Sequence, residues 1–418
     1  MLPVESFCPD RRRDDRRGRR LRRFPRLWLA ALLPLCVLLL GERAWAYPWM
    51  IRHNYTVCST CHIDPSGAGL MTLYGRAQSE LLLRTRYGEP PPDEDPMELG
   101  GFAFGAVPLP EELLLQADVR GLVLRVEPPS PAPGVTRFIL MQADLAAGVI
   151  VDRFRASVSL GYVHEGALAA SVTHGESDRL VSRQHWAGLV LGENDAFMLR
   201  AGRMNLPLGL RVIEHTLWTQ VATRTDVNAA QQHGVAFSYA TEAWRMEAMG
   251  ILGNFQLSPP ALRERGYAAY VERAFSQSAA VGLSSLITYA DHDVAAKRPV
   301  LRQAHGAFAR FVPAKPVVIM TEGDLLVRSP KGAEDEIGAT GMLQVDVEPL
   351  QGLHLIATGE LLNEDLSTRP ASVGGWLSVQ WFFLPHADVR FDFNHRNVPV
   401  GEDRAGVTSL LGQIHVFL

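Results

Sequence analysis

Most of this chain, from about residue 113 to residue 418, repeats a hydrophobic pattern with a period of two, and this pattern restricts the fold more than any other feature. Apolar side chains take every second position from Phe154 to Tyr162, with polar residues and glycine between them. The positions from Val389 to Phe393 alternate in the same way between apolar and charged residues. Successive side chains of a β-strand point to opposite faces, so each segment has one apolar and one polar face. The pattern predicts a mostly β fold.

The number and length of these segments favour a membrane barrel over a soluble β-sandwich, which also shows alternation. We count about 16 candidate strands of roughly 9–13 residues, many joined by short turns. Longer connections at 166–183, 209–232 and 291–302 are predicted to lie on one rim. An even number of strands with an apolar outer face and a polar lumen describes an outer-membrane barrel. We therefore predict a transmembrane antiparallel β-barrel of about 16 strands over residues 113–418, in contact with outer-membrane lipid.

The charge of the chain argues against a nucleic-acid-binding protein. Residues 1–46 hold 11 of the 41 basic and 5 of the 45 acidic side chains, so the rest of the chain carries 30 basic and 40 acidic ones. A nucleic-acid-binding domain would need a positive face instead. We expect no nucleic-acid partner.

The first 46 residues have the features of a secretion signal. An arginine-rich stretch ends at Arg26, the apolar run Leu27–Leu40 follows, and Ala44-Trp45-Ala46 supplies a cleavage pattern of small residues. A membrane-spanning helix is the alternative, but 14 residues rise only about 21 Å, which is short of the roughly 30 Å hydrocarbon core. We predict a signal peptide over 1–46 that is cleaved before Tyr47.

A C-x-x-C-H motif at Cys58, Cys61 and His62 would remain in the exported chain. Two thiols at this spacing add to the two vinyl groups on one edge of a porphyrin, and the histidine that follows ligates the iron. The motif therefore predicts one covalently bound haem c, held by Cys58, Cys61 and His62, with His62 as the metal ligand. A disulfide between the two cysteines is one alternative. A thioredoxin-like pair would need a βαβ context, and a zinc site would need further ligands.

The residues around the motif resemble a small mono-haem cytochrome c domain of bacterial envelope proteins. The resemblance rests on Asp64-Pro65, Leu73-Tyr74-Gly75-Arg76 and Arg86-Tyr87-Gly88 and covers about 45 residues. It implies a small α-helical haem-binding domain over 47–88. The proline-rich and acidic stretch 89–112 is predicted to be a linker without a helix.

A second stretch resembles a family too. Residues 200–211, RAGRMNLPLGLR, are similar to the strand and loop of phosphate- or anion-type porins, which implies a porin-like barrel. Several arginines could line its lumen, and we expect most of them to pair with lumen acids. They are Arg120, Arg153, Arg155, Arg200, Arg203 and Arg390.

The sixth ligand of the haem iron is not determined by the motif. His53, Met71 and Met50 are the nearest side chains of a ligating type, and an open position is the remaining alternative.

These features predict an electron-transfer protein of the outer membrane rather than an enzyme, although a haem peroxidase-type activity is not excluded. The haem domain is expected on the periplasmic side. Because the apolar band of a barrel is about 25 Å tall, one haem needs partners, so periplasmic or extracellular cytochromes are expected. Two alternatives stay open. The first is a diffusion porin whose haem domain acts as a gate or redox sensor, and the second is a soluble haem enzyme with a β-sandwich body.

Overall fold

The computed structural model of the protein describes residues 49–53, 55–67, 69–88, 95–129, 132–163, 179–214, 216–401 and 403–418. These residues belong to one compact unit, residues 42–418. The predicted signal peptide lies outside the described residues. The predicted linker 89–112 contains a short helix, α3 (Met97–Gly100), so the expectation of no helix there is wrong. Pro96 precedes this helix, at a position where a missing backbone N–H costs no helical hydrogen bond.

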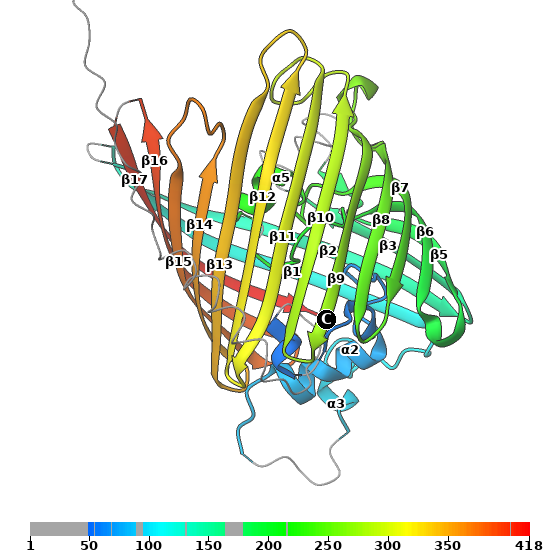
Figure 1. Cartoon of the computed structure of the whole chain (residues 1–418). Coiled ribbons are helices and arrows are strands. Elements are labelled where there is room, and N and C mark those ends of the chain that lie inside the picture. Colours follow the sequence, from blue (N-terminus) through cyan, green and yellow to red (C-terminus); the bar gives the residue numbers. More distant parts are fainter. Residues whose placement is uncertain are drawn as a thin grey trace, which may run out of the picture. The chain divides into compact units, whose positions relative to one another are not determined.

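The strands of the described residues form a single antiparallel sheet that closes on itself (Figure 1). Each strand pairs with its sequence neighbours, and β1 closes the ring by pairing with both β2 and β17. The two-residue β4 and the following strand β5 pair with different residues along the same edge of β3, so together they count as one strand position. The ring therefore has 16 strand positions. The predicted antiparallel barrel of about 16 strands is confirmed, and a β-sandwich body is wrong.

The strands are β1 (Leu113–Glu127), β2 (Val135–Val151), β3 (Phe154–Tyr162), β4 (Leu180–Val181), β5 (His185–Leu191), β6 (Phe197–Met204), β7 (Gln232–Ala240), β8 (Trp244–Gly253), β9 (Arg265–Ser276), β10 (Ala279–Ala290), β11 (Val300–Ala314), β12 (Val317–Pro330), β13 (Glu336–Leu350), β14 (Leu353–Asn363), β15 (Ser372–Leu384), β16 (Ala387–Val400) and β17 (Asp403–Phe417).

The barrel has an apolar outer face and a lumen rich in charged side chains. In β8, Leu252 faces outward and is 54% exposed, whereas Glu247 faces inward and is 1% exposed. Arg200 on β6 and Arg310 on β11 are equally buried on the inner face. This polarity is the reverse of that of a soluble protein and matches a barrel whose outer face contacts lipid. Within the described residues, every helix is too short or too polar to cross a bilayer.

The two rims of the barrel differ in the length of their connections. Tight turns such as Pro385-His386, between β15 and β16, lie on one rim. Two of the three predicted long connections lie on the other rim, where 205–231 joins β6 to β7 and 291–299 joins β10 to β11. Most of the third, 166–183, lies outside the described residues. Outer-membrane barrels place their short turns in the periplasm, so we expect the short-turn rim to face the periplasm.

The N-terminal segment packs inside the barrel near the short-turn rim, where α2 and α3 lie in Figure 1. It contains the helical turns η1 (Trp49–His53) and η2 (Cys58–Thr60), the helix α2 (Leu73–Gln78) and the π-helical turn η3 (Ser79–Leu83). Arg52 forms an ion pair of 2.6 Å with Asp346 of β13, which faces the lumen. A separate helical haem domain is therefore not confirmed, because this segment packs against the inner wall.

The connection 205–231 also folds inward, and we call it the inward loop. It carries the helix α5 (Trp218–Thr223). Glu322 of β12 accepts a hydrogen bond from the Leu210 N–H at 2.7 Å, and Glu360 of β14 accepts one from the Trp218 N–H at 3.0 Å. The lumen is thus filled from one rim by the N-terminal segment and narrowed by a loop whose backbone is bound to wall carboxylates.

His386 joins the N-terminal segment to the short-turn rim. Its Nε2 lies 2.6 Å from the Gly100 carbonyl oxygen and 3.0 Å from the Ser79 hydroxyl, so this nitrogen carries the proton. Nδ1 is buried without a hydrogen-bond partner among the described residues. Burial is the main cause that lowers the pKa of His386 from 6.5 to about 4, and the Arg76 guanidinium adds to it.

We expect acid to weaken this junction. Because the folded-state pKa lies below the ordinary value, the contribution of His386 to stability is complete above pH 6.5 and is lost as the pH falls from 6.5 to about 4. The loss amounts to about 3 kcal/mol, at 1.36 kcal/mol for each pKa unit. The measurement is the urea midpoint for proteolysis of the 73–100 segment, taken between pH 7 and pH 4. His386→Gln should flatten this dependence, and an equally steep one in the variant would contradict the assignment to His386.

Candidate functional site

The C-x-x-C-H residues form a tight turn ahead of α2. The N–H groups of Cys61 and His62 both donate to the Cys58 carbonyl oxygen, at 3.1 and 3.0 Å. This turn holds two sulfur atoms and an imidazole ring on five residues of backbone. Both cysteines are free thiols and half-buried, so the alternative of a disulfide is not seen.

The His62 ring is prepared to act as a ligand through one nitrogen. Its Nδ1 lies 3.2 Å from the carbonyl oxygen of Gly69. A carbonyl can only accept, so Nδ1 carries the proton and Nε2 keeps its lone pair. Metal-ligating histidines commonly donate their other N–H to such a carbonyl, which fixes the tautomer. Burial also lowers the pKa of His62, which favours the neutral ring that a metal requires.

Gly75 allows α2 to approach the motif closely. A Cβ atom at this position would lie 2.2 Å from the Cys61 carbonyl oxygen and 2.7 Å from its Cα. The neighbours are backbone atoms, so the clash has no flexible side chain to absorb it. Thr72 caps the same helix by accepting a hydrogen bond from the Gly75 N–H at 3.0 Å. Gly75, the first residue of the Gly75-Arg76 pair noted in the sequence, is therefore required for the close packing of α2 against the turn.

Gly75→Ala is expected to displace α2 from the motif and to destabilise the segment by about 1–3 kcal/mol, the usual cost of overpacking. The measurement is the urea midpoint for proteolysis of the segment. Gly359→Ala is the matched control, because a Cβ atom there meets nothing within 4 Å. Equal midpoints for the two variants would show that α2 does not pack as described.

The barrel wall holds the motif with a cluster of two arginines and one glutamate. Arg245 of β8 donates from Nη1 to the Cys58 sulfur at 2.7 Å and from Nε to Glu272 of β9 at 2.5 Å. Arg310 of β11 binds the same glutamate at 2.8 Å and donates to the Thr56 carbonyl oxygen at 3.0 Å. One carboxylate thus balances two guanidinium groups, and the cluster places a net positive charge beside the motif.

A second set of charges lies two residues after His62. Arg200 of β6 bridges Asp64, at 2.6 Å, and Glu247 of β8, and all three side chains are inaccessible to solvent. Burial alone would raise the pKa of Asp64, but the Arg200 guanidinium and the hydrogen bonds from Ser66 together outweigh burial and lower the pKa, so the carboxylate stays ionised. This triad fastens the motif to two strands of the wall.

A cavity of about 970 Å³ adjoins the motif. Its lining includes Cys58, Cys61 and His62, together with Leu70 and Met71 from the same segment. Ligand pockets commonly have a volume of about 300–1,000 Å³ and a largely apolar lining with a few polar groups. Two free thiols at the C-x-x-C spacing, an imidazole with a free Nε2 and an apolar surround fit a haem c.

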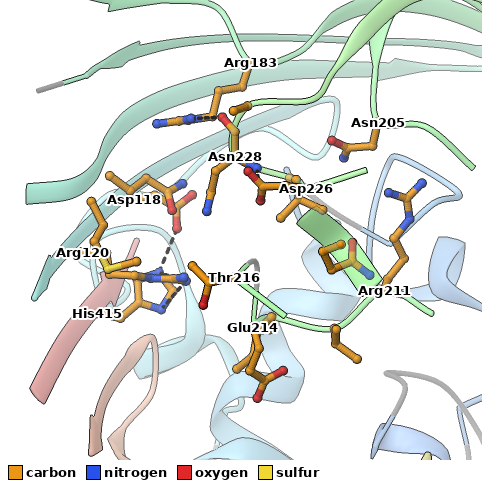
Figure 2. Close-up of a pocket in the computed structure, with 18 of the residues that line it drawn as sticks. Asp118, Arg120, Arg183, Asn205, Arg211, Glu214, Thr216, Asp226, Asn228 and His415 are labelled. Carbon is orange, nitrogen blue, oxygen red and sulfur yellow. Dashed lines mark hydrogen bonds and ion pairs between the residues drawn. The ribbon is translucent and has the colours of Figure 1, made fainter. Parts of the chain in front are cut away.

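The part of the cavity away from the motif is polar (Figure 2). His415 of β17 lies there with Nε2 3.1 Å from Asp118 of β1 and Nδ1 3.1 Å from Asp388 of β16. Arg120 lies against the same ring, and Arg211 and Glu214 enter from the inward loop. This polar part of the cavity extends from the motif to the residues of the inward loop.

The structure places the predicted residues in two groups. Cys58, Cys61 and His62 line one cavity, and Met50 and Met71 line it as well. His53 does not contact the cavity, because its Nε2 is bound to Glu348 at 2.9 Å. The role of the first three residues in binding haem stays a prediction.

The wall residues around the motif were not singled out from the sequence, apart from Arg200. Arg245, Glu247, Glu272 and Arg310 come from three strands, and only their inward positions in the period-two pattern mark them. Of the arginines expected in the lumen, Arg200 and Arg390 form buried ion pairs, as predicted. Arg153 lies instead in the turn between β2 and β3 and is exposed.

Comparisons with known proteins agree on the fold. No protein-family model and no curated protein matches the chain. Among solved structures, it is similar to a loop-deletion form of OmpT, an outer membrane protein of Vibrio cholerae, with a TM-score of 0.55 and 12% identity over 72% of this chain and 98% of that one. It is also similar to an anion-selective porin from Comamonas acidovorans, with a TM-score of 0.55 and 10% identity over 73% and 99% of the two chains. The outer membrane channel DcaP of Acinetobacter baumannii gives 0.52 and 10% over 73% and 97%.

The closed ring of 16 strand positions, its apolar outer face and these similarities define a porin-like β-barrel of the outer membrane. Within that class, this chain places a C-x-x-C-H segment inside its own lumen.

Proposed function

We propose that the protein is an electron-transfer protein of the outer membrane that carries one c-type haem, bound through Cys58 and Cys61 and ligated by His62. The observation that most directly supports this proposal is that two free thiols and the Nε2 of a neutral histidine line one cavity inside the barrel. When bound, such a haem supplies reversible one-electron transfer between Fe(III) and Fe(II). No substrate chemistry is required of the chain, so the protein is proposed to be an electron carrier and not an enzyme.

The chain's own residues would position and insulate this group. Gly69 fixes the tautomer of His62, and the Asp64–Arg200–Glu247 triad fastens the motif to the wall. The barrel separates the site from lipid, and the net positive charge of Arg245, Arg310 and Glu272 is offset by the second carboxylate of the Asp64–Arg200–Glu247 triad.

Redox partners would meet the protein on its two sides. The motif lies near the short-turn rim, which is periplasmic by the rule for such barrels, so a periplasmic cytochrome is the proposed partner on that side. The cavity continues from the motif to the inward loop, so a partner on the long-loop side of the barrel could approach the site from there.

The test is reconstitution of the purified protein in liposomes that enclose a soluble cytochrome. An impermeant reductant added outside should reduce the enclosed cytochrome, and the barrel should show a haem absorption that changes on reduction and survives acid acetone. A purified barrel without such absorption would refute the proposal.

A diffusion porin is the second candidate, and the similarity of the fold to an anion-selective porin favours it. Its haem segment would then act as a gate or redox sensor. Planar-bilayer recording distinguishes the two proposals, because a porin conducts ions at a steady level while an occluded electron carrier does not. Conductance that changes with the redox state of the haem would indicate the gate.

A further inference from the structure

We infer that Glu322 and Asp324 of β12 share one proton, and that this proton keeps the inward loop folded into the lumen, so that the loop opens as the pH rises. The two side chains lie two residues apart on the inner face of β12 and are 4% and 3% exposed. Neither of them lines the cavity beside the C-x-x-C-H motif, so the inference does not depend on haem being bound.

The two carboxyl groups are in direct contact with each other. Their side chains are joined by a hydrogen bond. Ionised carboxylates can only accept hydrogen bonds, so this bond requires a proton on one of the two groups. Neither oxygen of Asp324 has any other partner in the described part of the chain. Two carboxylates that share one buried site cannot easily both be ionised, and one shared proton removes the repulsion between them.

The elements that pack against the pair supply no ion pair to balance a second negative charge. The residues opposite the pair on β11 and β13 are uncharged, and they are Gly306, Phe308, Thr340 and Met342. The helix α5, which contacts β12, also has no charged side chain. Arg211 of the inward loop acts on Glu322 through its charge, but its guanidinium donates to the Leu206 carbonyl oxygen and not to a carboxylate.

The inward loop rests directly on one of these carboxyl groups. The Leu210 N–H donates to Glu322 at 2.7 Å. Gly209 has a φ of +56°, and a Cβ atom at this position would lie 2.0 Å from the other oxygen of Glu322. Ionisation of both carboxyls would push them apart and draw water to them, and Glu322 cannot move away without losing its bond to Leu210.

The other attachment of the loop has its charge balanced already. Glu360 of β14 accepts the Trp218 N–H at 3.0 Å, and it is paired with Arg396 at 2.6 Å. This attachment needs no proton, so the loop has one attachment that depends on pH and one that does not. The contribution of the Glu322–Asp324 pair is complete while the proton is bound and is lost as the pH rises. Residues 209–213 should therefore be released while α5 stays in place.

The test is amide hydrogen exchange in the full-length protein in detergent, at pH 6 and pH 9. Protection factors are used, because they remove the intrinsic effect of pH on exchange. The protection of residues 209–213 should fall about tenfold or more at pH 9, whereas that of residues 217–221 should stay nearly constant. Infrared difference spectra should show a protonated carboxyl group that is lost over the same range of pH.

Asp324→Asn and Glu322→Gln test the shared proton directly. Each variant leaves a single carboxylate beside an amide that can donate to it, so residues 209–213 should stay protected at pH 9, and the infrared signal should be absent. Glu336→Gln is the matched control, because Glu336 is a carboxylate of β13 that pairs with Arg328 at the rim, and this variant should open as the wild type does.

Three results would overturn the inference. The first is a wild type in which the protection of residues 209–213 does not fall between pH 6 and pH 9. The second is an equal fall in both Asp324→Asn and Glu322→Gln. The third is release of the loop at pH 6 by EDTA, which would place a metal ion where we infer a proton. Heat-modifiable migration shows that each barrel is folded, and either of the two variants suffices if the other does not assemble.

Discussion

Replacing Cys58 and Cys61 together by alanine is expected to abolish covalent haem while the barrel still assembles. Haem c attachment uses both thiols, so the variant has no anchoring atom left. The barrel should survive because its strands pair without either cysteine, and both side chains are small and only half-buried. Intact-protein mass, haem-stained gels and heat-modifiable migration measure the two effects separately.

Ser59→Ala is the matched control for this variant, because the exposed Ser59 lies between the two cysteines in the same turn. It should keep one haem for each chain. A double-alanine protein that retained acid-acetone-stable haem, or a wild type with the mass of the bare chain, would show that the motif has another use. The single-cysteine variants should retain less haem than the wild type, held through one thioether bond that still survives acid acetone.

Arg200→Met should release the motif from the wall, which is the largest stability effect that we expect. The substitution leaves Asp64 and Glu247 buried and without their bridging cation. Breaking a buried ion pair by removing one partner costs about 3–5 kcal/mol. The urea midpoint for proteolysis of the N-terminal segment should fall, and ion conductance should rise as the segment leaves the lumen.

Arg125→Gln is the control for Arg200→Met, because Arg125 pairs with Glu127 at the barrel rim, where both side chains are more than 40% exposed. Exposed pairs contribute about 0–1 kcal/mol, so this variant should resemble the wild type. Adding Asp64→Asn and Glu247→Gln to Arg200→Met should recover much of the stability, since removal of every charge leaves none unpaired. An unchanged midpoint in Arg200→Met would mean that the triad does not hold the segment.

The barrel was predictable because its signals are local. The alternation in β3 and β16 needs only neighbouring residues to be read, and the same pattern repeated over about 16 segments leaves few folds open. For the charged residues of the lumen, the sequence predicted that arginines pair with acids, but it did not predict the individual pairs. Arg200 and Arg390 were expected to meet acids, but which acids they meet depends on strands far away in the sequence.

The position of the motif was not predictable from the chain alone. A resemblance to a small cytochrome domain implied a periplasmic module, yet residues 49–83 pack against β6, β8, β11 and β13 inside the lumen. This packing depends on contacts between residues separated by more than 100 positions, such as Asp64 with Arg200 and Thr56 with Arg310. The inward loop escaped prediction for the same reason, since Glu322 and Glu360 hold it from distant strands.

The sequence by itself determined the β-barrel and the pair of thiols next to a histidine, because a two-residue period and a five-residue motif are properties of adjacent positions. Only the tertiary structure decided that the barrel encloses the motif and that the His53 side chain is bound to Glu348 of the wall. Those facts follow from the closure of the sheet, which brings residues that are distant in the sequence across one lumen.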